Sequence, residues 1–242
     1  MRTVLVTGGA RGIGRAIALD LAGKGHDVAI CYRTSAAAVD ETVADIERRG
    51  VRALAVHADV SDPDAVEALF ARVREVLGAP AVLVHAAGPY QRTDVLKETP
   101  AGWRNMLANN LDSFFYCTRL AIPGMVENKW GRIIGFGMAN ADRAAAVPGV
   151  AAHYVAKVGV LTLTRSLARA VAPHGVTVNA ISPGFIASGS APEEELTRML
   201  KNIPAGYIGT LDDAVGVAAF LVSDAARYVN GANLILSGGW GI

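Results

Sequence analysis

The sequence has little charge and no long hydrophobic run. Charged residues make up 19% of the 242 residues, and 23 basic against 22 acidic side chains leave a formal net charge of +1. This balance supplies no broad basic field for nucleic acid, so we expect no polyanionic partner. No stretch approaches the roughly 20 apolar residues that a membrane span requires, so we expect no membrane partner either.

Cysteine is also scarce. Cys31 and Cys117 lie far apart and belong to no Cys-x-x-Cys motif or Cys/His cluster. This spacing excludes a disulfide scaffold and a thiolate metal site, and it is typical of a reducing compartment. The first predicted strand begins without a preceding signal-peptide pattern. We therefore expect a cytoplasmic protein without a metal.

Short apolar runs alternate with helical patterns along the whole chain. With 52% hydrophobic residues, 242 residues are enough for one substantial core, and no linker divides them, so we predict a single domain over 1–242. Apolar strands that alternate with helices indicate an α/β fold with a parallel sheet covered on both faces. The predicted strands are 4–6, 28–31, 53–56, 81–84, 132–136, 176–180 and 233–236, and the predicted helices are 15–22, 36–49, 62–77, 103–125, 155–172 and 212–222.

One polar segment, residues 188–204, interrupts this alternation. Loops longer than about a dozen residues inside a compact domain are usually functional. We interpret the segment as a mobile substrate lid. An ordinary surface loop is the alternative.

A glycine-rich turn follows the first predicted strand. The segment from Thr7 to Gly14 reads Thr-Gly-Gly-Ala-Arg-Gly-Ile-Gly, with a helical pattern directly after it. Glycines in such a turn let the backbone approach a pyrophosphate at the positive end of the helix. The strand before the turn and the helix after it make a dinucleotide site the favoured interpretation.

The end of the second predicted strand favours NADP(H). Folds that prefer the unphosphorylated cofactor usually carry an acid here, whereas this chain has Arg33, Thr34 and Ser35. A planar guanidinium matches a phosphate well, so we expect Arg33 and Arg11 to surround a 2′-phosphate with the two hydroxyls. The alternative is that both arginines are ordinary solvated charges.

Taken together, these motifs resemble the short-chain dehydrogenase/reductase family over nearly the whole chain, and most closely its 3-oxoacyl thioester reductase branch. The resemblance implies a Rossmann-type, three-layer, doubly wound parallel sheet of about seven strands, with a nicotinamide cofactor across the strand ends. It also implies a homotetramer packed through the long helices, or a homodimer. The matching segments are Thr7 to Gly14, Asp59-Val60, Leu83 to Gly88, Asn110-Leu111, Gly131 to Ile134, Lys157 to Ala168, Asn179 to Gly184 and Ser237 to Gly239.

The resemblance completes the expected cofactor site. In this family the residues after the Pro183-Gly184 turn bind the nicotinamide carboxamide through the backbone and a hydroxyl, which Ser188 supplies here in place of the more usual threonine. The expected cofactor-binding residues are Thr7, Gly8, Arg11, Gly12, Ile13, Gly14, Arg33, Thr34, Ser35, Asp59, Val60, Ala87, Gly88, Lys157, Pro183, Gly184, Ile186 and Ser188.

The catalytic residues depart from the family's pattern. The family uses an asparagine, a serine that holds the substrate oxygen, a tyrosine that gives or takes its proton, and a lysine that lowers the tyrosine pKa. Asn110 and Lys157 match this set, but Met138 stands at the serine position and cannot donate a hydrogen bond. His153, four residues before Lys157, stands at the tyrosine position.

Two neighbouring features accompany these departures. Tyr154 points about 100° away from His153 on a helix, so it reaches the site only if the helix start is distorted. The turn that usually reads Asn-Asn-Ala-Gly is His85-Ala86-Ala87-Gly88 here, which we expect to change packing around the cofactor more than chemistry.

Three functions remain open. In the first, the protein reduces the carbonyl of a 3-oxoacyl thioester or small ketone with NADPH. His153 is then the general acid, with a pKa near neutral that the ammonium of Lys157 lowers. In the second, the substrate is an activated double bond or a ring imine. In the third, the chain binds the dinucleotide without catalysis, as a sensor or an inactive partner subunit. We favour the first, and the third is its main alternative.

Overall fold

The fold is an α/β sandwich built on one parallel sheet. The computed structural model describes residues 1–34, 36–143, 145–189 and 193–241, so the expectation for Ser35 lies outside it. Seven strands pair in parallel in the order β3-β2-β1-β4-β5-β6-β7, which confirms the predicted sheet. Their bounds are β1 Thr3–Thr7, β2 Asp27–Tyr32, β3 Ala53–His57, β4 Val82–His85, β5 Gly131–Phe136, β6 Val176–Pro183 and β7 Asn233–Leu236.

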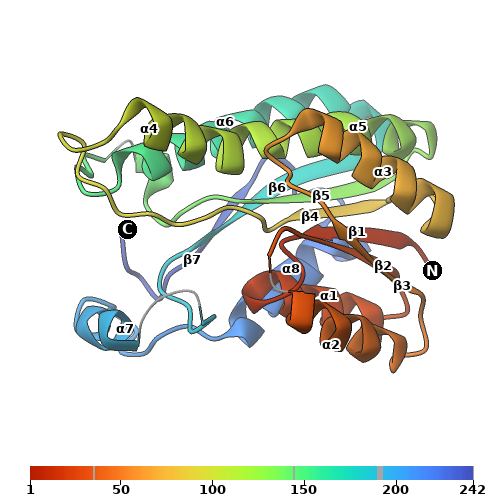
Figure 1. The fold of residues 1–242 in the computed structure, drawn as a ribbon, viewed down its shortest axis with the longest axis horizontal. Helices are drawn as coiled ribbons and strands as arrows, with labels where there is room; N and C mark the ends of the chain where they lie inside the picture. The colour runs from red at the N-terminus through yellow and green to blue at the C-terminus, as the bar shows by residue number, and fades with distance from the viewer. Residues whose placement is uncertain (35, 144, 190–192, 242) are drawn as a thin grey trace.

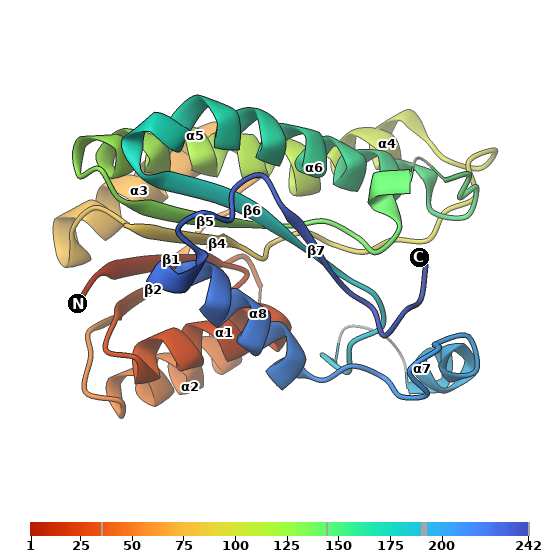
Figure 2. The same cartoon turned by 180° about the vertical axis from the view of Figure 1, so that it is seen from behind.

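Helices cover both faces of the sheet (Figures 1 and 2). One face carries α3, α4, α5 and α6, and the other carries α1, α2 and α8. The central strands are buried on both sides, as β1 is along its whole length, and this explains why the strand sequences are apolar without alternation. The helix bounds are α1 Gly12–Gly23, α2 Ala36–Glu47, α3 Pro63–Leu77, α4 Pro100–Leu107, α5 Ser113–Glu127, α6 Ala151–Val171, α7 Glu193–Leu200 and α8 Leu211–Val222.

Local sequence explains where α3 begins and ends. The Asp62 side chain accepts a hydrogen bond from the Asp64 backbone N–H, and Pro63 occupies the first turn, where its missing N–H costs nothing. Gly78 follows the last turn with a φ of 91°. The buried positions recur at helical spacing and pack the helix onto the sheet: Val66, Leu69, Phe70, Val73 and Leu77.

The single long helix predicted over 103–125 is wrong in one respect. The structure has α4, then a π-helical segment at Ala108–Asp112, then α5. The side-chain amides of Asn109 and Asn110 donate to the carbonyls of Asn105 and Met106, which competes with the regular helical ladder. Such π-bulges occur often at functional sites.

The predicted lid contains a helix that its polar sequence did not reveal. Within 188–204, α7 lies apart from the two helical layers (Figure 1). Residues 190–192 of the predicted lid are not among the described ones. Movement of this segment remains a prediction.

Three further expectations concern absences. Cys31 and Cys117 are both buried and unbonded. Within the described ranges, no three His, Cys, Asp or Glu side chains gather closely enough to hold a metal ion. Over the same ranges, no helix combines the length and hydrophobicity that crossing a membrane requires.

A buried chain of hydrogen bonds through His85 ties β1 to β4 and α5. His85 Nδ1 lies 3.0 Å from Thr7 Oγ1, and His85 Nε2 lies 3.1 Å from Ser113 Oγ. Ser113 donates to the Asn109 carbonyl, so His85 must donate through Nε2 and accept at Nδ1. Thr7 in turn donates to His85 and accepts the Ala87 backbone N–H. A neutral imidazole satisfies every partner, and burial lowers the pKa of His85 to about 3.

We expect this chain to make the fold sensitive to acid. The pKa of His85 is about 3 in the folded protein and 6.5 ordinarily, so below pH 6.5 the unfolded chain binds a proton that the folded chain excludes. The free energy of unfolding should therefore fall toward pH 3, by up to about 1.4 kcal/mol per pH unit from this group. In urea denaturation between pH 7 and 4, His85→Asn should show a shallower decline than wild type. His174→Asn, at an exposed position, should keep the wild-type slope, and an equally steep decline in His85→Asn would contradict the assignment.

Candidate functional site

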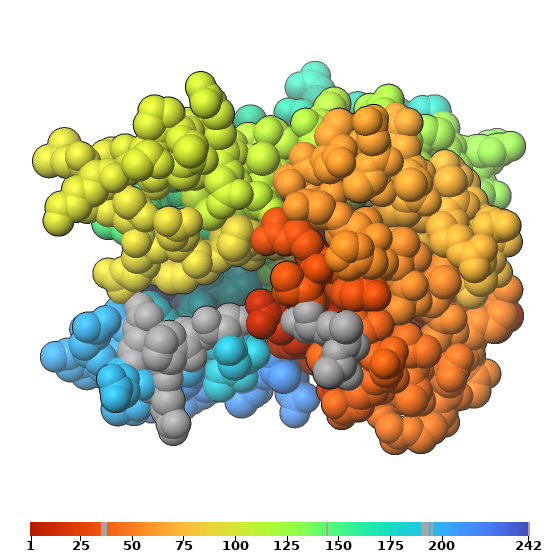
Figure 3. Space-filling model, viewed as in Figure 1, coloured from red at the N-terminus to blue at the C-terminus, as the bar shows by residue number. Residues whose placement is uncertain are grey.

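Two adjoining cavities open at the carboxyl ends of the central strands. The first has a volume of about 390 Å³ and is lined by the glycine-rich turn, the end of β2 and the turn after β4. The second, of about 460 Å³, lies on the side of α7. Figure 3 shows the surface hollowed between the yellow segment before α4 and the blue region of α7. Residues common to both cavities are Ile13, Tyr90, Gly137, Pro183 and Ser188.

Glycines shape the first cavity by allowing close backbone contacts. A β-carbon on Gly14 would lie 2.4 Å from the carbonyl oxygen of Gly8, so only glycine fits there. Gly88 has a φ of +152°, and a β-carbon on it would lie 2.5 Å from Asn110 Oδ1. The first turn of α1 points its free backbone N–H groups at the same space. This cradle fits the pyrophosphate of a dinucleotide.

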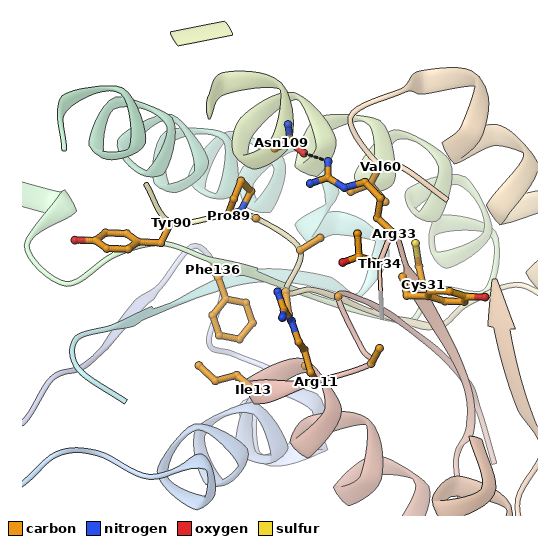
Figure 4. Close-up of a pocket in the computed structure, with 18 of the residues that line it drawn as sticks. Arg11, Ile13, Cys31, Arg33, Thr34, Val60, Pro89, Tyr90, Asn109 and Phe136 are labelled. Carbon is orange, nitrogen blue, oxygen red and sulfur yellow. Dashed lines mark hydrogen bonds between the residues drawn. The ribbon is translucent and has the colours of Figure 1, made fainter. Parts of the chain in front are cut away.

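Basic side chains surround the end of this cavity near β2. Arg33 Nη1 donates to Asp59 Oδ2 at 3.1 Å and to Asn109 Oδ1 at 2.8 Å, so the guanidinium bridges two walls (Figure 4). Arg11 extends into the cavity from the start of α1, and Thr34 also lines it. The predicted phosphate-binding side chains that the structure describes therefore meet at one place, together with one carboxylate.

Asp59 is ionised in this setting. Burial by itself would raise the pKa of its carboxyl, but hydrogen bonds from Ser61 and from Arg33 outweigh burial and lower that pKa. Asp59 therefore balances part of the positive charge of Arg33. It also starts a turn, since its Oδ1 accepts the Ser61 backbone N–H at 3.0 Å.

Lys157 reaches the first cavity from α6. Its side chain is 7% exposed, and Nζ donates to the Phe136 carbonyl at 2.9 Å. Burial lowers the pKa of Lys157 to about 8, because the buried ammonium has few compensating partners. The group stays mostly charged near neutrality and loses that charge in mildly alkaline solution.

Asn110 lies behind the turn after β4 and lines neither cavity in the described part of the chain. It is 1% exposed, and its amide donates to the carbonyls of Met106 and Pro89. Oδ1 is buried and finds no partner among the described residues. The π-helical segment thus presents an unsatisfied acceptor to the back of Gly88.

His153 lines the second cavity beside Met138, one helical turn before Lys157. It is 6% exposed, and no described group pairs with its Nδ1. Burial and the nearby charge of Lys157 lower the pKa of His153 to about 3, although a hydrogen bond to the Pro89 carbonyl opposes the shift. The expected direction is confirmed, but the shift is so large that the imidazole is neutral at pH 7. The prediction that its pKa is near neutral is therefore wrong, because burial dominates.

The Tyr154 side chain is buried in the core and lines neither of the two cavities. Helix α6 begins regularly at Ala151, so its start is not distorted. The Tyr154 hydroxyl donates to the Asn140 carbonyl and accepts the Ala145 backbone N–H, both at 2.8 Å. Both hydrogen bonds hold the loop before α6, and the side chain is 5% exposed.

Most of the predicted cofactor residues line the first cavity. Thr7 does not, because it is buried behind the turn in the His85 chain. Gly184 and Ile186 line the second cavity instead. The predicted residues that line the first cavity are Gly8, Arg11, Gly12, Ile13, Gly14, Arg33, Thr34, Asp59, Val60, Ala87, Gly88, Lys157, Pro183 and Ser188.

Sequence reasoning missed two residues at this site. Tyr90 lines both cavities, and its ring meets the His153 ring edge to face at a centroid distance of 5.1 Å. Its position just after a strand-end turn is a usable signal, since ligands bind at the carboxyl ends of such strands. Asn109 orients Arg33, and two adjacent asparagines inside a helical pattern were the signal for it.

Similarity to known proteins agrees with this geometry. The family model described as Enoyl-(Acyl carrier protein) reductase matches residues 8–241. The chain is 37% identical over 241 residues to the 3-oxoacyl-[acyl-carrier-protein] reductase FabG of Staphylococcus aureus, covering 98% of this chain and 97% of the relative. The crystal structure of acetoin dehydrogenase YohF from Salmonella typhimurium is 30% identical and superposes with a TM-score of 0.90, covering 99% of this chain and 97% of that one. The chain therefore belongs to the short-chain dehydrogenase/reductase family of oxidoreductases.

Proposed function

We propose that the protein is an NADPH-dependent reductase that acts on a carbonyl group of a small ketone or a 3-oxoacyl thioester. The observation that carries this proposal is the junction of the two cavities, where Lys157 and His153 stand one helical turn apart and line one cavity each. The name of the Staphylococcus aureus relative, a 3-oxoacyl-[acyl-carrier-protein] reductase, supports the thioester class.

The first cavity would hold the cofactor through the groups already described. The glycine-rich turn and the start of α1 would bind the pyrophosphate, and Arg11, Arg33 and Thr34 would bind the 2′-phosphate. Ser188, at the boundary with the second cavity, would bind the carboxamide. The bound cofactor would supply the hydride, and the protein would position the carbonyl carbon against it.

The two residues of α6 would contribute charge and orientation. Lys157 would stabilise the negative charge that develops on the substrate oxygen. His153 would act as a neutral hydrogen-bonding side chain, because its pKa is too low for an imidazolium. The absence of a hydroxyl on Met138 favours the second candidate, a cofactor-binding protein without reductase activity. Tight NADPH binding without turnover of any carbonyl would select it.

We further propose that the chain forms a homotetramer or homodimer through α5 and α6. Phe115 and Val155 are 46% and 44% exposed on these helices, which is unusual for large apolar side chains. Light scattering coupled to size-exclusion chromatography should give a multiple of the 25.2 kDa chain mass. Phe115→Glu should lower that mass, whereas Leu96→Glu, at a 93% exposed loop position, should not. A monomeric wild type would contradict the proposal.

Replacing Arg33 should reveal the cofactor preference. Arg33→Ala should raise the Kd for NADPH roughly 10- to 100-fold, the value of a hydrogen bond between charged groups, and change the Kd for NADH by less than about 3-fold. Fluorescence titration of both cofactors measures this. Arg72→Ala, which removes an exposed ion pair on α3, is the matched control and should bind both like wild type. An equal increase in the Kd for NADPH and for NADH would contradict the proposal that Arg33 binds the 2′-phosphate.

The charge of Lys157 should set an alkaline limit. Because its pKa is about 8, kcat/KM for NADPH should be level below pH 8 and fall as the ammonium deprotonates above it. Lys157→Ala should lower the plateau roughly 100-fold or more and abolish this limb. Lys157→Arg should retain charge and move the limb to higher pH, while exposed Lys97→Ala should leave the profile unchanged. A wild-type profile that is level to pH 10 would show that Lys157 does not act through its charge.

A further inference from the structure

Reduction of a carbonyl in this protein requires a proton as well as a hydride. Hydride addition to a ketone produces an alkoxide, which is about as basic as hydroxide, with a conjugate-acid pKa of roughly 16. A positioned side chain that gives a proton to this oxygen in the transition state accelerates the step by roughly 100- to 10,000-fold. Such a donor has to lie where the two cavities meet, because the nicotinamide and the carbonyl carbon must touch there.

His153 cannot supply this proton. Its imidazole is neutral, because burial and the charge of Lys157 lower its pKa to about 3. A neutral imidazole carries one N–H, and the hydrogen bond to the Pro89 carbonyl uses it. The other nitrogen, Nδ1, is therefore unprotonated, and it is buried with no partner among the described residues.

Three other polar side chains near the junction are also poor proton donors to the substrate. Lys157 lines the first cavity, on the cofactor side, and its ammonium donates to the Phe136 carbonyl. Arg92 lines the second cavity, but a guanidinium does not lose a proton in proteins. Ser188 lines both cavities, but an aliphatic hydroxyl is about as weak an acid as the alcohol product.

Tyr90 has both the position and the acidity that the step requires. It lines both cavities, so its side chain stands at their junction. A phenol has a pKa of about 10, so transfer of its proton to an alkoxide is favoured roughly a million-fold. Figure 4 shows the Tyr90 hydroxyl at the end of the ring that points away from Arg11 and Arg33, which lie at the nucleotide end.

The Tyr90 side chain is held from two sides. The carbonyl of the preceding residue, Pro89, accepts the Asn110 side-chain amide at 3.3 Å. The Tyr90 ring packs edge to face on the His153 ring, with a centroid distance of 5.1 Å and an interplanar angle of 88°. His153 therefore supports the phenol ring, and Tyr90 is nevertheless 53% exposed.

We propose that Tyr90 is a catalytic residue whose phenol donates the proton to the substrate oxygen. The proposal rests on the proposed function, because reduced nicotinamide dinucleotide supplies the hydride. The C–H bond of the reduced nicotinamide breaks and a C–H bond to the carbonyl carbon forms. The O–H bond of Tyr90 breaks and an O–H bond to the carbonyl oxygen forms, which gives an alcohol, the oxidised dinucleotide and a phenolate. The exposed phenolate then regains a proton from water.

Removal of the Tyr90 hydroxyl is the first test. Stopped-flow measurements follow single-turnover oxidation of NADPH by acetoacetyl-coenzyme A and by ethyl acetoacetate at pH 7. Tyr90→Phe keeps the ring against His153 and should lower the rate roughly 100-fold or more, because the proton is transferred in the transition state. KM for the ketone and Kd for NADPH should stay within about 3-fold of wild type. Tyr228→Phe, at a 99% exposed position, is the matched control and should react like wild type.

A second variant separates proton donation from a structural role of the hydroxyl. Difluorotyrosine in place of Tyr90 keeps the ring and the hydroxyl but makes the phenol more acidic. The single-turnover rate should then begin to fall below pH 8, the limit that Lys157 sets in the wild type, because the phenol loses its proton earlier. Difluorotyrosine in place of Tyr228 should leave the profile unchanged. This comparison also decides the matter if Tyr90→Phe melts below wild type.

The outcomes separate this proposal from the proposed function. A full single-turnover rate in Tyr90→Phe, a raised KM with an unchanged rate, or an unshifted pH profile with difluorotyrosine would each overturn the role of Tyr90 while the proposed function stands. NADPH binding with no reduction of any carbonyl by the wild type would overturn both.

Discussion

The packing of one short turn organises the whole carboxyl edge of the sheet. The turn after β4 lies between the glycine-rich turn on one side and the π-helical segment on the other, and a β-carbon on either Gly14 or Gly88 would collide with backbone or side-chain oxygen. The turn is held by the buried histidine of β4, which connects to β1 in one direction and to α5 in the other. Because these contacts are closely packed, the first cavity has a well-defined floor.

Burial determines the charge states of the two basic side chains of α6, Lys157 and His153, because it lowers the pKa of each. A buried ammonium and a buried imidazole cannot both carry a proton one helical turn apart, and the lysine keeps its charge because its ordinary pKa is far higher. The histidine is therefore neutral, and most of the side chains that line the second cavity are apolar or aromatic, with Arg92 among the exceptions. Arg11, Arg33 and Lys157 bring positive charge to the first cavity, and Arg92 brings one positive charge to the second, whose lining is otherwise mostly apolar.

Much of this arrangement was open to prediction from local patterns. The buried strands are apolar on both faces. The spacing of the glycines after the first strand indicates a turn whose backbone can approach a phosphate closely. Such patterns involve residues that are close together in the sequence, so they can be recognised without knowledge of the tertiary contacts. The sequence did not predict the π-helical segment at Ala108–Asp112. This segment depends on two asparagine side-chain amides that donate to backbone carbonyls of the helix, and these hydrogen bonds require the surrounding tertiary packing.

The sequence by itself determined the layered parallel sheet, the glycine-rich turn after the first strand and the presence of Met138 and His153 in place of hydroxyl-bearing side chains expected from the resemblance, since each is a matter of residue type and spacing. Only the tertiary structure decided that Tyr154 supports a loop, that Tyr90 from a distant turn stands against His153, and that Asn109 holds Arg33. It also decided the protonation of His153, whose pKa of about 3 reflects burial and a neighbouring charge. Such properties depend on what surrounds a side chain in space, and residue spacing along the chain does not specify those surroundings.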